Sequence, residues 1–287
     1  MTGQALDSNY HSTATGTKLH YLQTGNATGQ LILCLHGLGG SSDTFLPLLP
    51  HLPAKDNIVL VDFQGFGKTP LTKSPNIVTV ANHVADVGDL ITALQRNSTS
   101  KNKSIFIIGH SLGAIVALQY AALHPEVING LTLLGAGRSA ARIPAARERM
   151  LDLAASVRSK GIAFAAELAT KSNFYESTPE RTATLEAREA VKNAVLAADP
   201  EAYARTCEAI VDWEHKDPEY KKIVSPALFI AGDKDMISPV ERSRDLSALL
   251  GGKSCVEVVK SGHQPILEDT AGVAEAINKF LRCAKEE

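Results

Sequence analysis

Residues 104–120 read SIFIIGHSLGAIVALQY, which is an apolar run, a polar turn and then a stretch rich in alanine and leucine. The run predicts a buried β-strand and the stretch predicts a buried helix, with Gly109-His110-Ser111-Leu112-Gly113 at the turn between them. Glycines on either side of the serine keep Cβ atoms out of a crowded turn, and the serine is held at strained backbone angles with its hydroxyl projecting from the sheet. The segment therefore predicts covalent catalysis through Ser111.

A serine hydroxyl is a weak nucleophile until a base, an acid that orients the base and an oxyanion hole surround it. The predicted base is His263, which follows an apolar strand at 254–260. Another predicted strand, at 226–231, is followed by Gly232-Asp233-Lys234-Asp235. We favour Asp235 as the triad acid because it lies beyond the strand, where the loop can turn its carboxylate toward the histidine. Asp233 is the alternative acid; in a structural role it would bind backbone N–H groups of its own turn.

The glycine-rich loop His36-Gly37-Leu38-Gly39-Gly40 follows a further predicted strand, at 30–35. A loop at this place in the chain can supply one oxyanion N–H, and its glycines let the backbone approach a substrate closely. We predict that the backbone N–H groups of Leu38 and Leu112 form the oxyanion hole. His36 is expected to orient the loop without taking part in the chemistry. A simple connecting turn is the alternative interpretation of this segment.

These segments, together with Asp62-Phe63-Gln64-Gly65-Phe66-Gly67-Lys68-Thr69, resemble the marks of the α/β-hydrolase superfamily. The order Ser111, Asp235, His263 along the chain is also the order of the α/β-hydrolase triad. The resemblance covers nearly the whole chain and implies an α/β-hydrolase fold, a hydrolytic activity, and no cofactor or metal. Since serine holds the nucleophile position, the resemblance excludes haloalkane dehalogenases and epoxide hydrolases, which use an aspartate there.

The alternation of strands and helices predicts an α/β fold, with a mostly parallel sheet covered by helices on both faces. Strands are predicted at 18–23, 30–35, 57–62, 104–109, 130–134, 226–231 and 254–260, and helices at 44–52, 80–96, 112–124, 239–250 and 271–284. Ligands of such sheets bind beyond the carboxyl ends of the strands, which is where every predicted catalytic residue falls.

Residues 138–220 carry Ala, Glu and Arg at helical spacing and no clear strand. We interpret them as a helical cap inserted after the sixth strand of the α/β-hydrolase fold, here the predicted strand at 130–134, over a hydrolase core of residues 1–137 and 221–287. The cap is expected to select the substrate. Five of its side chains are candidates for substrate binding: Arg138 and Arg142 for a carboxylate, and Phe174, Tyr175 and Trp213 for an apolar part. The alternatives are a solvated helix face for the arginines and packing within the cap for the aromatic side chains.

Within the cap, Asp199 to Ile210, followed by Trp213, resembles the end of the cap in 3-oxoadipate enol-lactonases. The resemblance implies a serine hydrolase that opens a lactone through an acyl-enzyme on Ser111, with a small-molecule ester or lactone as its partner. General carboxylesterases and carbon–carbon bond hydrolases of this fold share similar segments and are alternatives. A ligand-binding receptor with a slow or silent triad is the alternative from another class, and rapid turnover of a small ester or lactone would exclude it.

The chain has 287 residues, 44% of them hydrophobic, so it is long enough to bury the core of one such domain. Its net charge of −2 gives no electrostatic basis for binding nucleic acid or an anionic membrane. No apolar run is long enough to span a membrane, and the first residues lack the charged and hydrophobic regions of a signal peptide. These features predict a cytoplasmic protein and give no prediction of its oligomeric state.

Overall fold

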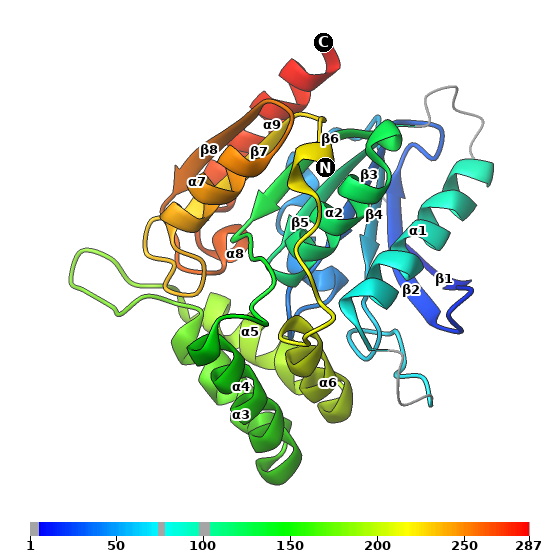
Figure 1. The fold of residues 1–287 in the computed structure, drawn as a ribbon. Helices are drawn as coiled ribbons and strands as arrows, with labels where there is room; N and C mark the ends of the chain where they lie inside the picture. Colours follow the sequence, from blue (N-terminus) through cyan, green and yellow to red (C-terminus); the bar gives the residue numbers. More distant parts are fainter. Residues whose placement is uncertain (1–5, 74–77, 98–103, 287) are drawn as a thin grey trace.

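The computed structural model describes residues 6–73, 78–97 and 104–286; positions 1–5, 74–77, 98–103 and 287 of the predicted core lie outside the described residues. Its centre is an eight-stranded sheet in the order β1-β2-β4-β3-β5-β6-β7-β8 (Figure 1). The strands are β1 (Asp7–Ser12), β2 (Lys18–Gly25), β3 (Leu31–Leu35), β4 (Asn57–Val61), β5 (Ile105–His110), β6 (Ile128–Leu134), β7 (Ala227–Gly232) and β8 (Ser254–Val259). Strands β1 and β2 pair antiparallel with their neighbours, and all pairs from β4 to β8 are parallel. The prediction of a mostly parallel sheet is confirmed.

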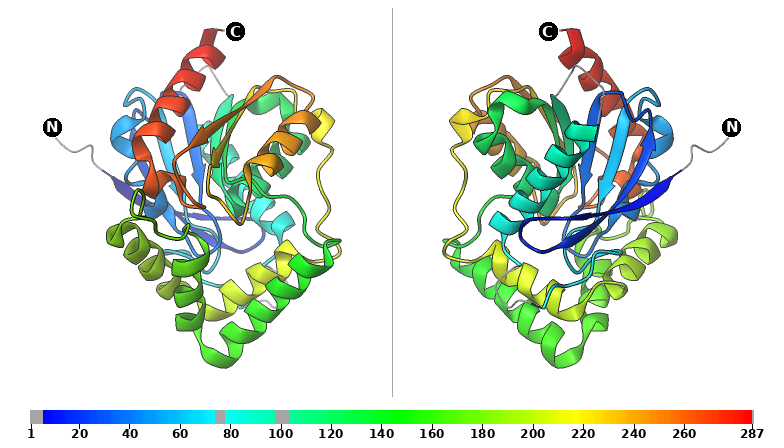
Figure 2. Two further views of the ribbon diagram at one scale, coloured as in Figure 1. Left: turned by 90° about the vertical axis from the view of Figure 1, so that its left-hand side faces the viewer. Right: turned by 90° about the vertical axis from the view of Figure 1, so that its right-hand side faces the viewer.

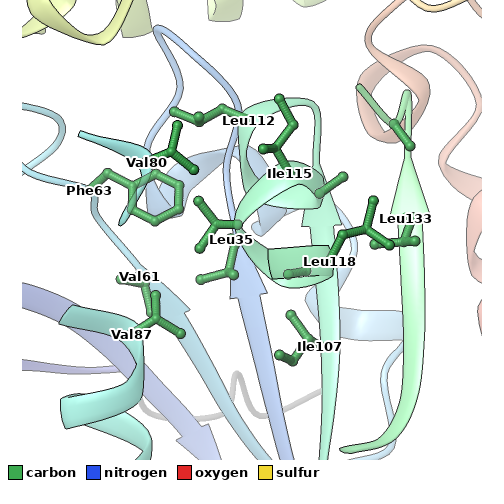
Figure 3. Close-up of a cluster of buried hydrophobic side chains, with 14 of the residues drawn as sticks. Leu35, Val61, Phe63, Val80, Val87, Ile107, Leu112, Ile115, Leu118 and Leu133 are labelled. Atoms are coloured by element: carbon green, nitrogen blue, oxygen red, sulfur yellow. The ribbon is translucent and has the colours of Figure 1, made fainter. Parts of the chain in front are cut away.

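Helices cover both faces of this sheet because its central strands are apolar on both sides. In β3, Leu31, Leu33 and Leu35 face one layer, whereas Ile32 and Cys34 face the other. The first layer contains α1 (Val80–Asn97), α2 (Leu112–Leu123) and α7 (Val240–Leu249), and Figure 3 shows side chains of α2 among those of β3, β5 and β6. The second layer contains the short 3₁₀ turns η1 (Ser42–Phe45) and η2 (Leu49–His51), together with α8 (Pro265–Glu268) and α9 (Thr270–Glu286).

Four helices join β6 to β7 and lie together beyond one end of the strands of the sheet (Figures 1 and 2). They are α3 (Pro144–Lys160), α4 (Ile162–Ser172), α5 (Leu185–Leu196) and α6 (Pro200–Ile210). Side-chain caps explain where two of them begin: Thr184 Oγ1 accepts the N–H of Ala187 at 3.1 Å, and Asp199 Oδ1 accepts that of Ala202 at 2.9 Å. Helix α5 shares a cavity with the loops that follow β3 and β8, so this helix lies over the carboxyl ends of these parallel strands.

Some elements differ from the sequence-based expectations. Strand β1 is absent from the predicted strands because its sequence, DSNYHS, is polar and it lies at the edge of the sheet. The predicted helix over 44–52 is wrong: η1 and η2 take its place, because Pro47 and Pro50 cannot donate the backbone hydrogen bonds of a continuous helix. In the described ranges, no helix is both long and apolar enough to cross a membrane.

Candidate active site

Ser111 lies at the turn between β5 and α2 with φ 51° and ψ −109°, and no other non-glycine residue in the described part of the chain has a positive φ. Its N–H donates to the carbonyl oxygen of Leu134 on β6 at 2.9 Å. A Cβ at Gly109 would lie 2.5 Å from the carbonyl oxygen of Gly113, and a Cβ at Gly113 would overlap the carbonyl oxygen of Leu35. The turn therefore requires both glycines, and the packed strands around it hold the serine in its strained conformation.

Ser111, His263 and Asp235 form one continuous chain of hydrogen bonds. Ser111 Oγ lies 3.1 Å from His263 Nε2, and His263 Nδ1 lies 2.8 Å from Asp235 Oδ2. An ionised carboxylate only accepts hydrogen bonds, so Nδ1 carries the proton and the lone pair of Nε2 faces the hydroxyl. His263 and Asp235 are 5% and 4% exposed, whereas Ser111 is partly accessible. The structure thus brings the three predicted triad residues together, with the base in the tautomer that can accept the serine proton.

The carboxylate of Asp235 is held by more than the histidine. Its second oxygen, Oδ1, accepts the N–H groups of Ile237 and Ser238, both at 2.8 Å. Burial acts to raise the pKa of Asp235, but His263 and these two N–H donors outweigh it, and the pKa lies below the usual value of the group. Asp235 therefore stays ionised at neutral pH and can stabilise a protonated His263.

The alternative acid, Asp233, has other partners. One carboxylate oxygen contacts Arg181 Nη1 at 2.6 Å, and the other accepts the N–H of Ser261 at 3.1 Å. Burial acts to raise the pKa of Asp233, but Arg181 outweighs it and the pKa lies below its usual range. Asp233 thus joins residues from 138–220 to the segment that precedes His263, which differs from the expected binding of its own turn.

The loop that contains Leu38 lies against Ser111. A Cβ at Gly37 would lie 3.0 Å from Ser111 Cβ, so the loop and the serine are in direct contact. Leu112 is the first residue of α2, where a backbone N–H has no partner within its own helix. Within the described part of the chain, the N–H groups of Leu38 and Leu112 make no hydrogen bond with another protein group. Both are therefore available to an oxygen atom bound beside Ser111.

His36 fixes this loop to the end of β4. Its Nδ1 donates to the carbonyl oxygen of Gly37 at 2.7 Å, and its Nε2 accepts the N–H of Phe63 at 3.0 Å. Burial lowers the pKa of His36, and Asp62 opposes the shift without reversing it. The imidazole is thus neutral with both nitrogens occupied, as a loop-orienting residue requires.

Comparison with known proteins identifies the family. The family model of the alpha/beta hydrolase fold matches residues 30–270. The chain belongs to the α/β-hydrolase fold family.

Individual relatives of this α/β-hydrolase are distant in sequence. A pimeloyl-[acyl-carrier protein] methyl ester esterase of Neisseria meningitidis is 28% identical over 258 residues, which cover 87% of this chain and 93% of the esterase. A thermophilic esterase from Thermogutta terrifontis has a similar structure, with a TM-score of 0.83, 25% identity and coverage of 97% and 99% of the two chains. The enol-lactonase from Burkholderia xenovorans LB400 superimposes with a TM-score of 0.80 at 23% identity, covering 96% of this chain and all of the enol-lactonase, and shows the shared fold.

A cavity of about 470 Å³ adjoins Ser111 of this α/β-hydrolase. It lies between α5 and three segments of the core: residues 37–44, the turn at Gly67 and Lys68, and residues 264–267. The triad side chains are not part of its wall, but Gly37 is, and Gly37 touches Ser111. Its charged lining residues are Lys68 and Asp43, and Asn173, Asn193 and Gln264 add polar groups.

The sequence does not single out the buried network that holds two walls of this cavity. The Asp62 carboxylate accepts the N–H groups of Ser42 at 2.6 Å and Lys68 at 2.9 Å, and it lies 2.7 Å from His20 Nδ1. A Cβ at Gly67 would overlap this carboxylate, so the glycine lets the turn close around it. The motif at 62–69 is the sequence signal for this network, in which His20 and Asp62 have structural roles.

The predicted carboxylate-binding arginines lie elsewhere. Arg138 pairs with Asp217, with Nε at 2.9 Å from the carboxylate, so its guanidinium is already occupied. Arg142 is exposed and is not part of the cavity wall. Neither candidate arginine lines this cavity: Arg138 is paired with a distant acid, and Arg142 is exposed.

The predicted aromatic residues also lie outside the cavity wall. Trp213 is 57% exposed and packs under the guanidinium of Arg147, which lies 4.7 Å from its ring centroid. Phe174 is buried under Arg188, and Tyr175 lies under Arg181. The alternative of packing within residues 138–220 describes Phe174 and Tyr175 better, whereas Asn173 does line the cavity.

Proposed function

We propose that this protein is a serine hydrolase that cleaves a carboxylic ester through an acyl-enzyme on Ser111. The observation that carries the proposal is the hydrogen-bond chain from Ser111 Oγ through His263 to Asp235 Oδ2, at 3.1 and 2.8 Å. Both distances are within hydrogen-bond reach, and the proton moves across the link between Ser111 and His263. The strained, partly accessible serine and the adjacent cavity support the same role.

In the proposed mechanism, His263 Nε2 takes the proton of Ser111 as Oγ attacks the ester carbonyl carbon. The N–H groups of Leu38 and Leu112 stabilise the oxyanion of the tetrahedral intermediate, and Asp235 stabilises the imidazolium. His263 then gives its proton to the departing alkoxide, which leaves an acyl-enzyme. A water molecule, deprotonated by His263, attacks the acyl carbon, and the proton returns to Ser111 as the acid is released.

We propose a lactone as the preferred ester, because residues 199–210 resemble the cap of 3-oxoadipate enol-lactonases. A ring-opened lactone leaves as one molecule, so a compact covered cavity is sufficient for it. The second candidate is a general carboxylesterase. It is favoured by the charges of the cavity wall, which contains one cationic side chain, Lys68, and one anionic side chain, Asp43. Such a wall selects neither a charged nor a neutral ligand.

We further propose that residues 138–220 act as a cap over a core formed by residues 1–137 and 221–287. Three features support this division. Helix α5 and Asn173 form part of the cavity wall, Arg181 bridges to Asp233, and the four helices lie outside the sheet layers. The cap would then set which acyl or alcohol groups reach Ser111.

The test is hydrolysis of a carboxylated enol-lactone, neutral lactones and p-nitrophenyl esters, with Ser111→Ala as the control. Fast lactone opening that S111A abolishes supports the lactonase proposal, and ester cleavage alone supports the carboxylesterase. Binding without turnover would overturn both in favour of a receptor. Full activity in S111A would overturn the serine mechanism itself.

A further inference from the structure

The short loop that carries His263 is held through its backbone as well as through its side chain. Three consecutive N–H groups of this loop donate hydrogen bonds. The N–H groups of Gly262 and Gln264 both donate to Glu268 Oε1, at 2.9 and 3.2 Å. The N–H of His263 itself donates to the carbonyl oxygen of Asn173 at 2.7 Å. The loop is therefore fixed from two sides, by α8 and by the segment after α4.

Packing leaves the loop little room to move toward the second of these sides. A Cβ at Gly262 would lie 2.7 Å from the carbonyl oxygen of Asn173 and 3.1 Å from the Cα of Phe174. On the other side, the Glu268 carboxylate is the acceptor that occupies both flanking N–H groups. Removing this acceptor would leave two partly buried donors unsatisfied in the present arrangement, which is unfavourable. The loop would then relax by moving, and His263 would move with it.

The carboxyl group of Glu268 is buried more deeply than is usual for an ionisable side chain in a turn. Its second oxygen, Oε2, is buried and has no hydrogen-bond partner among the described residues. Burial raises the pKa of Glu268, although the two N–H donors and the nearby Arg181 and Arg188 oppose the shift. Glu268 thus lies where burial disfavours its ionised form, and its Oε1 binds the N–H groups on either side of His263.

We propose that Glu268 is a positioning residue for His263, and that it sets the distance between His263 Nε2 and Ser111 Oγ. This inference rests on the proposed serine hydrolase function. The Nε2–Oγ contact is already 3.1 Å, so a small displacement of the imidazole takes the pair out of hydrogen-bond range. A misplacement of about 1 Å in a catalytic group lowers the rate by on the order of 100-fold.

Two substitutions separate positioning from charge. In Glu268→Gln the side-chain amide oxygen can still accept both N–H groups, whereas Glu268→Ala has no acceptor. We expect E268A to lower kcat by about 10- to 100-fold with KM within about twofold, and E268Q to retain kcat within about threefold. Glu257→Ala is the matched control, because Glu257 is a β8 carboxylate 3.7 Å from Lys279 and contacts no catalytic residue.

The measurement uses p-nitrophenyl acetate hydrolysis, together with the rate at which a fluorophosphonate labels Ser111. The labelling rate reports the reactivity of the serine without depending on substrate fit, and both rates are normalised to folded protein. Glu268→Asp keeps the charge but withdraws the oxygen, and it should lower both rates at least about fivefold even if E268A does not fold. A structural role alone would lower the unfolding midpoint and leave the rates per folded molecule unchanged.

Rates for E268D within twofold of the wild type would overturn the inference, as would an E268Q variant as slow as E268A. S111A distinguishes this failure from that of the proposed function. If S111A is inactive and E268A fully active, only the role of Glu268 is refuted. If S111A keeps its activity, the serine mechanism fails, and the role of Glu268 fails with it.

Discussion

Replacing Asp235 by asparagine should leave the shape of the site almost intact and yet remove nearly all of the activity. The reason lies in the second oxygen of this carboxylate. Oδ1 accepts two backbone N–H groups, from Ile237 and Ser238, each at 2.8 Å. Only an oxygen can take that place, so the side-chain amide introduced by Asp235→Asn must direct its NH₂ group toward His263 Nδ1.

The reversed donor then forces the wrong tautomer on the base. His263 Nδ1, now 2.8 Å from a donor, has to accept, and its proton moves to Nε2. A protonated Nε2 cannot take the proton of Ser111. In a serine protease triad the same change lowers kcat by about 10⁴-fold, which corresponds to about 5.5 kcal/mol of transition-state stabilisation. We expect a loss of that order here.

Asp233→Asn is the matched control, two residues away on the same loop. It weakens a partly exposed pair with Arg181, which is worth about 0.2–1 kcal/mol, while the amide oxygen can still accept the N–H of Ser261, so kcat should stay within about threefold. Initial rates with p-nitrophenyl acetate measure both variants. A D235N enzyme with more than a tenth of the wild-type kcat would refute the tautomer argument, and a large loss in D233N instead would make Asp233 the acid.

Three further results are expected. Gly113→Ala should lower the free energy of unfolding by about 1–3 kcal/mol, because its Cβ would overlap the carbonyl oxygen of Leu35. Gly137→Ala is the control, because its Cβ would meet only the flexible end of Ile115. Equal losses of stability in the two variants would contradict the argument. Lys68→Met should raise KM for a carboxylated lactone about two- to fivefold over that for a neutral lactone, and Asp43→Asn should lower it; equal effects on both substrates would rule out a charge contact in the cavity. The stability advantage of the wild type over D235N should grow as the pH rises from about 3 to 6. The reason is that a carboxyl group whose folded-state pKa is lowered contributes stability above its unfolded pKa and loses it as the pH falls through the folded pKa. Urea unfolding at several pH values measures this difference, and a constant difference would count against the lowered pKa.

The residues proposed for catalysis could be predicted from sequence because each one lies in the short loop that follows a strand. Parallel strands end at one edge of a sheet, so residues that follow three separate strands meet there even when they lie 152 positions apart, as Ser111 and His263 do. Distance beyond the strand is the only reason in the sequence to prefer Asp235 over Asp233. The deciding fact, that Asp233 is occupied by Arg181, depends on a contact across 52 positions that no local pattern indicates.

The substrate-binding residues could not be predicted in the same way. Periodicity identifies a helical segment between β6 and β7 but not which face of each helix meets the cavity. Arg138 and Arg181 are paired with Asp217 and Asp233, and Arg158 with Glu201 and Glu208. Arginines that the sequence alone suggests as ligand-binding groups are thus ion-paired with acidic residues that lie far away in the sequence. Lys68, which does line the cavity, lies in a core motif that sequence analysis used only to identify the fold.

The segment between β6 and β7 also contacts His263, the proposed base, which changes the expected effect of substitutions in this segment. The carbonyl oxygen of Asn173 accepts the N–H of His263, and Arg181 holds Asp233, whose other oxygen accepts the N–H of Ser261. The backbone of the loop is therefore fixed at Ser261 and at His263 in part by residues 138–220. A change in how these helices pack would alter the position of the base as well as the shape of the cavity. If the segment selects the substrate as proposed, we expect substrate selection and turnover to be coupled, and variants that change the packing around Asn173 should alter kcat together with KM.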